Sequence, residues 1–146
     1  MFKWYVCNIK HKIRIFILIL NFCIKLIHRG ITHDNSKFSK LEATYFSKYV
    51  EKLKSTTYGS EEYYKMKAEL SVALEHHYQN NRHHPEHFPN NDYSNMDLID
   101  LVEMYCDWCV ASKNEADGEM RKSIDHNRRR FNMAFDLVEI FKNTEL

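Results

Sequence analysis

Residues 60–87 read SEEYYKMKAELSVALEHHYQNNRHHPEH, and residues 60–79 repeat apolar side chains with the period of an amphipathic helix. Ser60 followed by Glu61 and Glu62 favours a helix start, because a serine hydroxyl caps backbone N–H groups and acids stabilise the first turn. At about 100° per residue, one face carries Tyr63, Met66, Leu70, Ala73, Leu74 and His77. This face predicts that His77 points into the protein and that His76 does not.

The end of this stretch is dense in histidine, with five of the chain's nine histidines: His76, His77, His83, His84 and His87. A single inward histidine is usually a core residue with one hydrogen bond. Several imidazoles brought together repel one another when protonated, however, and a bound cation removes that repulsion. Neutral imidazole is also the commonest protein ligand of transition metals. We therefore expect a metal site, with a loop over residues 80–95.

An acidic stripe follows in the next predicted helix, residues 96–112. Asp100, Glu103 and Asp107 lie nearly opposite the main apolar face of this helix. Such a stripe is usually solvated, but this one is bordered by apolar residues: Ile99, Met104 and Trp108. A half-buried carboxylate needs a cation or a hydrogen-bond donor. We expect at least one of the acids to bind the metal, Asp107 foremost.

A third candidate segment precedes both, at His33 and Asp34. Adjacent residues diverge by about 100° on a regular helix, so both can reach one metal only from a turn or a helix end. Lys37 places a positive charge nearby that suits a phosphate oxygen. A surface turn through Asp34 and Ser36 is the other interpretation.

Composition favours an all-α fold in one domain, residues 1–146. The chain has 146 residues with 44% hydrophobic side chains, and its three glycines and two prolines leave few helix breaks. We predict a compact bundle of about five helices, with residues 2–27, 40–54, 60–79, 96–112 and 118–142 helical. The net charge of +1 indicates no polyanionic partner, and we expect no specific nucleic acid.

The apolar stretch Ile13–Ile27 follows basic residues and resembles a signal anchor. Arg14, Asn21 and Lys25 interrupt it, and its longest apolar run is far shorter than the roughly 20 residues that a span requires. We therefore expect a buried first helix in a soluble, cytoplasmic protein without a membrane partner. A membrane-anchored accessory protein is the alternative.

The order of these residues resembles the HD superfamily of metal-dependent phosphohydrolases. The resemblance rests on His11, His33–Asp34, Lys37, His77, His83–His84 and Asp107. More narrowly, HDNSKF (33–38), HHYQNNRHH (76–84) and EMYCDW (103–108) are similar to motifs of a small uncharacterised family common in phage and virus genomes. The resemblance implies an HD-like helical fold, one or two divalent metal ions and hydrolysis of a phosphate ester.

On this resemblance the expected metal ligands are His11, His33, Asp34, His77, His83, His84 and Asp107. A straight helix over residues 2–27 would hold His11 too far from His33, so His28 is an alternative to His11. Mixed nitrogen and oxygen donors favour Mn, Fe, Co, Ni or Zn.

The expected substrate is a small phosphate ester, such as a nucleotide. Asp34 and Lys37 would be catalytic, and Lys37, Asn81 and Arg82 would contact the substrate. Arg128–Arg130 and His126 form either a solvated basic face or a positive rim for an anion. The rival is a non-catalytic, metal-stabilised binding protein of viral origin, placed like the enzyme in the host cytoplasm.

Overall fold

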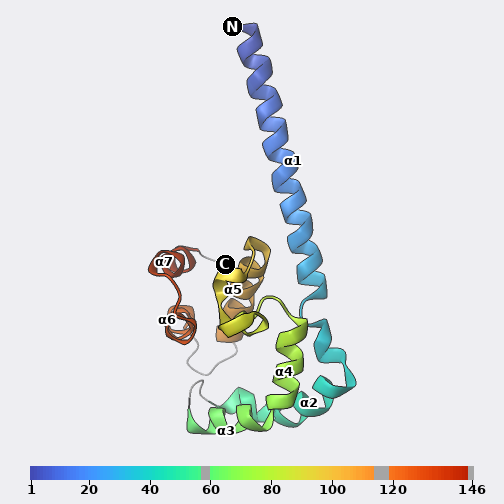
Figure 1. Cartoon of the computed structure of the whole chain (residues 1–146), viewed down its shortest axis with the longest axis vertical. Coiled ribbons are helices and arrows are strands. Elements are labelled where there is room, and N and C mark those ends of the chain that lie inside the picture. Colours follow the sequence, from blue (N-terminus) through green and yellow to red (C-terminus); the bar gives the residue numbers. More distant parts are fainter. Residues whose placement is uncertain (57–59, 114–118, 145–146) are drawn as a thin grey trace. The chain divides into compact units, whose positions relative to one another are not determined.

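A computed structural model describes residues 1–56, 60–113 and 119–144, with only the backbone described for residues 50–55 (Figure 1). The α-helices are α1 (Phe2–Thr32), α2 (Lys40–Ser55), α3 (Glu61–Glu69), α4 (Ser71–Asn80), α5 (Leu98–Lys113), α6 (Met120–Phe131) and α7 (Phe135–Asn143). Short 3-10 turns are η1 (Asn35–Phe38), η2 (Pro85–His87), η3 (Pro89–Asn91) and η4 (Tyr93–Asn95). No strand occurs among these described residues, which confirms the all-α prediction. The chain divides into two units, Met1–His33 and Asp34–Leu146.

The first unit is α1, a single unbroken helix that continues through Gly30 (Figure 1). None of its residues is buried, so the prediction of a buried first helix is wrong. Within the described part of the chain, this is the one helix long and apolar enough to cross a membrane by length and composition. Core helices of soluble proteins and signal sequences can meet the same criterion.

The second unit contains the remaining helices and the apolar core. Helix α4 packs against α2, and α6 packs against both α5 and α7. The buried apolar residues come mainly from the last three helices: Met96, Met104, Tyr105, Trp108, Cys109, Ile124, Phe131, Met133, Val138 and Phe141. These contacts fix α5, which carries the acidic stripe, within the second unit.

Helix ends follow local side-chain chemistry. The Ser60 hydroxyl accepts a hydrogen bond from the Tyr63 N–H at 3.1 Å, as the sequence predicts. Helix α5 begins instead with a reciprocal pair, in which Asp97 and Asp100 each accept from the other's backbone N–H. The predicted helix over residues 118–142 is two helices, because Asn132 adopts a left-handed conformation with φ 48°, which asparagine tolerates at a helix end.

The predicted helix over residues 60–79 is likewise divided in two. Leu70 ends α3 and precedes α4, with φ −86° and ψ 1°. The hydrogen-bond ladder continues across this point, since the Leu74 N–H donates to the Leu70 carbonyl at 2.9 Å. The apolar face therefore passes from Met66 and Leu70 to Ala73 and His77, all four of which are buried.

Candidate metal centre

Asp34 opens the second unit and provides its central carboxylate. It has a left-handed backbone conformation, with φ 55° and ψ 22°, directly before the η1 turn. Aspartate is among the few residues other than glycine found there with any frequency. Its carbonyl accepts the Lys37 N–H at 2.8 Å, and the residue is only 9% exposed. The turn thus holds a carboxylate inside the protein at a fixed point.

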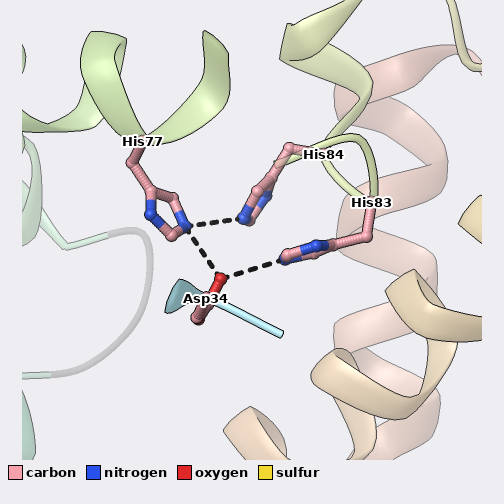
Figure 2. Close-up of side chains that lie close together, drawn as sticks. All are labelled: Asp34, His77, His83 and His84. Carbon is pink, nitrogen blue, oxygen red and sulfur yellow. Dashed lines mark hydrogen bonds and ion pairs between the residues drawn. The ribbon is translucent and has the colours of Figure 1, made fainter. Parts of the chain in front are cut away.

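Three histidines converge on this carboxylate (Figure 2). His77 lies on the last turn of α4, and His83 and His84 follow in the segment before η2. Oδ1 of Asp34 lies 3.3 Å from Nε2 of His77 and 3.4 Å from Nε2 of His83. Nε2 of His84 lies 3.0 Å from Nε2 of His77. One donor atom from each of these four residues lies within 4.8 Å of all the others.

These separations match the spacing between ligands around one small cation. Bonds of about 2.0–2.1 Å to zinc place neighbouring ligands about 3.3–3.4 Å apart in a tetrahedron, and closer in an octahedron. The Asp34–His77 and Asp34–His83 separations of 3.3 and 3.4 Å fall at the tetrahedral value. The donor set, three imidazole nitrogens and one carboxylate oxygen, also fits a transition metal.

Buried glutamates orient two of the three imidazoles. Nδ1 of His77 lies 2.9 Å from Oε2 of Glu42, which is 0% exposed. Nδ1 of His83 lies 3.1 Å from Oε1 of Glu103. An ionised carboxylate can only accept, so Nδ1 of each imidazole carries the proton and Nε2 presents its lone pair to the cluster. A carboxylate behind the imidazole is the usual second layer of a metal site.

Further hydrogen bonds hold His77 in place. The Asn81 side chain donates to the His77 carbonyl at 2.7 Å and to the Ser36 hydroxyl at 2.7 Å. Glu42 also bonds His76 at 2.6 Å, so one buried carboxylate serves both neighbouring histidines. His77 is 4% exposed, whereas the His76 side chain is 36% exposed. The predicted inward direction of His77 is therefore confirmed.

Burial favours the neutral imidazole of His77 and of His84. Burial lowers the pKa of His77, although Asp34 and Glu42 act in the opposite direction. Burial also lowers the pKa of His84, and the positive charges that His83 and His77 would carry lower it further. Burial would raise the pKa of Glu42, but its hydrogen bonds with His76, Ser36 and His77 outweigh burial and lower it. Neutral histidines and ionised acids are the forms that bind metal.

Two further predicted residues lie beside Asp34. Nζ of Lys37 lies 2.5 Å from Oδ2 of Asp34, the oxygen that does not face the histidines, and the lysine side chain is 50% exposed. A carboxylate oxygen of Asp107 lies within 4.8 Å of an Asp34 oxygen. Lys37 therefore contacts both Asp34 and solvent, and Asp107 adds a second carboxylate beside Asp34.

The other predicted residues take different positions. Arg82 forms a bidentate ion pair with Asp100, in which Nε donates to Oδ1 at 3.3 Å and Nη2 donates to Oδ2 at 2.9 Å. Helix α1 separates His11 from Thr32 by 21 residues, roughly 31 Å at 1.5 Å per residue. His11 therefore cannot share an ion with His33, the residue that follows this helix. His33 is the last residue of the first unit, and Arg130 of the basic segment pairs with Glu86.

Glu42 is the site residue that the sequence reasoning missed. It lies in the first turn of α2, where its N–H donates to the Ser39 hydroxyl at 3.2 Å. Its one signal in the sequence is a carboxylate that shares a helix face with Tyr45, Phe46 and Tyr49. An acid on an aromatic face is a candidate for burial with a partner.

Comparison with known proteins identifies the family. The chain matches the "Family of unknown function (DUF5662)" over residues 4–144 and belongs to that family. No curated protein matches the chain, and no solved structure matches it.

Proposed function

We propose that the second unit binds a divalent transition-metal ion through Asp34, His77, His83 and His84, and that it hydrolyses a small phosphate ester. The observation that carries this proposal is the pairing of two imidazoles with buried glutamates while their Nε2 atoms face one carboxylate. An isolated core histidine needs one hydrogen bond. Two imidazoles oriented in the same way toward one oxygen indicate a common ligand between them.

His33 and Asp107 are the proposed ligands of a second ion. Asp34 has two carboxylate oxygens and could bridge two cations, and Asp107 lies close to it. His33 enters this proposal because it precedes Asp34 in the chain, in the order that the HD superfamily shows. Asn81 is proposed to orient His77, since it bonds both the His77 carbonyl and the Ser36 hydroxyl.

The proposed reaction is the attack of water on phosphorus. The water oxygen forms a bond to phosphorus, the bond from phosphorus to the leaving oxygen breaks, and the leaving alcohol takes up a proton. A divalent cation in the site would lower the pKa of a water molecule, so that hydroxide is available near neutral pH. Lys37 is proposed to offset negative charge on the phosphoryl oxygens, because its ammonium group borders both Asp34 and solvent.

The proposed substrate class is nucleotide-like, a nucleoside phosphate or cyclic nucleotide. It follows from the resemblance to HD phosphohydrolases in the order His33–Asp34, Lys37, His77, His83–His84 and Asp107. Arg82 fits a substrate role less well than the sequence suggested, because its guanidinium holds Asp100. Lys37 is therefore the cation that we assign to the phosphate.

The test uses the full chain, stripped with a chelator and reloaded separately with Mn, Co or Zn. Phosphate release is measured across a panel of nucleotides, for the wild-type protein and for Asp34→Asn. Asp136→Asn, an exposed acid on α7, makes the same change outside the site and serves as the control. Metal-dependent turnover in wild type and control, lost in Asp34→Asn, is expected. Retained turnover in Asp34→Asn would place the chemistry elsewhere.

A non-catalytic metal site is the second candidate, and one observation favours it. The cluster already offers four protein donors, which suffice to close a tetrahedral zinc site without water. Metal-loaded protein that releases no phosphate from any ester of the panel, and whose metal has four protein ligands, would support this alternative.

A further inference from the structure

Helix α1 carries large apolar side chains that are exposed along its length. None of its residues is buried, and the exposed side chains include Ile9 at 57%, Phe16 at 65% and Ile27 at 62%. Exposed apolar surface on this scale marks an interaction site rather than an ordinary solvated helix.

Most polar residues of α1 lie on one side of the helix. At 100° per residue, a sector of about 100° contains Lys3, Lys10, His11, Arg14, Asn21, Lys25, His28 and Arg29. Lys12 is the charged residue that lies outside this sector. The opposite side carries Tyr5, Ile9, Ile13, Phe16, Leu20, Cys23, Ile27 and Ile31. Helix α1 is therefore amphipathic along its whole length, with a narrow basic face and a broad apolar face.

All charged side chains of residues 1–33 are positive. Residues 1–33 contain six lysines and arginines and no aspartate or glutamate, a net charge of +6. The whole chain carries 21 basic and 20 acidic residues. Residues 34–146 therefore carry 15 basic and 20 acidic residues, a net charge of −5. A basic, amphipathic and exposed helix complements the anionic headgroups and the acyl boundary of a lipid bilayer.

We propose that α1 binds the surface of an anionic lipid bilayer and lies in the plane of the interface. Arg14 and Lys25 are separated by 11 residues, about 16 Å, whereas the hydrocarbon core is about 30 Å thick. Every stretch of about 20 residues within α1, the length that a span requires, contains at least one of these two cations, so a spanning helix would place a cation inside the hydrocarbon. An in-plane helix keeps the basic sector at the headgroups from Lys3 to Arg29 and inserts the apolar face.

The test is sedimentation of the full chain with vesicles of phosphatidylcholine alone or mixed with phosphatidylserine. Binding to the mixed vesicles is expected, with weaker binding at high salt and release by alkaline carbonate. The triple variant Lys10→Glu/Arg14→Glu/Lys25→Glu should bind them about tenfold less or weaker still. The control Lys40→Glu/Lys48→Glu/Lys113→Glu makes the same charge change at exposed positions of the second unit and should bind like wild type.

A second variant, Phe16→Asp/Ile27→Asp, keeps every cation and changes only the apolar face, and it should also lose binding. Circular dichroism shows whether each variant keeps its helix content. Equal binding to both vesicle types, or equal loss in the control triple variant, would overturn the proposal. Resistance to carbonate would show a spanning helix and overturn the in-plane arrangement. Self-association without vesicle binding would show that a second copy covers α1.

Discussion

The substitution Glu42→Gln tests whether a buried carboxylate sets the metal-binding form of His77. Glu42 accepts from His76 and from His77, at 2.6 Å and 2.9 Å. Glutamine keeps the shape of the side chain, but it has one oxygen acceptor and one nitrogen donor. It can therefore satisfy one Nδ1–H group, while its amide nitrogen faces the other imidazole.

The loss of metal affinity in Glu42→Gln depends on which of its two orientations the amide adopts. With its oxygen toward His77, the variant loses only the negative charge, and His76, which is partly exposed, can turn to water. With its nitrogen toward His77, it draws the proton of that imidazole to Nε2, where the proton blocks metal binding. Removing such a second-layer carboxylate typically lowers metal affinity by about 10-fold to 100-fold, equivalent to about 1.4–2.7 kcal/mol. We expect a value within this range.

The assay is calorimetric titration of chelator-stripped protein with Zn or Co. Glu75→Gln makes the same change at an exposed position of α4 and should leave metal affinity unchanged. Thermal unfolding of the metal-free proteins separates loss of fold from loss of affinity. A folded Glu42→Gln protein that binds metal as tightly as wild type would refute the reasoning about His77.

Three further substitutions address separate parts of the account. His77→Ala should lose bound metal on dialysis and His76→Ala should retain it, because only His77 joins the cluster; equal metal content in both would contradict this. Lys37→Ala should keep the metal and lose about 100-fold in turnover, and loss of metal would instead make Lys37 a structural partner of Asp34. Arg82→Ala should lower the free energy of unfolding, measured by urea titration, by about 2–3 kcal/mol. The reason is that Asp100, at 0% exposure, would lose its guanidinium partner. An unchanged free energy of unfolding would count against that contact.

The spacing of apolar residues was sufficient to predict the position of several helices of the second unit. The predicted helix over residues 40–54 is observed as Lys40–Ser55, and the one over residues 96–112 as Leu98–Lys113. The phase of His77 predicted its burial, which is observed, and the apolar borders of the acidic stripe predicted half-buried acids. Asp107 is half-buried, whereas Asp100 and Glu103 are buried. Each of these features depends on the residues of a single helix face, and those residues can be identified from their spacing in one sequence.

Contacts between distant segments were not predictable in the same way. Glu42 reaches His77 across 35 residues, and nothing near Glu42 in the sequence indicates that partner. The division of residues 118–142 depends on Asn132, whose left-handed conformation is one of several that asparagine accepts. The expectation of a buried α1 treated its apolar residues as core, although they cover a broad face beside a narrow basic one. His11 entered on the resemblance alone, and the length of α1 separates it from His33.

The most direct test of the central claim is the coordination of metal in the purified protein. The protein is loaded with Co or Zn and dialysed, its metal content is measured, and X-ray absorption identifies the donor atoms. We predict at least one retained ion per chain with imidazole nitrogens at about 2.0–2.1 Å, and loss of that ion in the double variant His77→Ala/His83→Ala. A wild-type chain that retains no metal, or a metal bound by oxygen donors alone, would contradict the account.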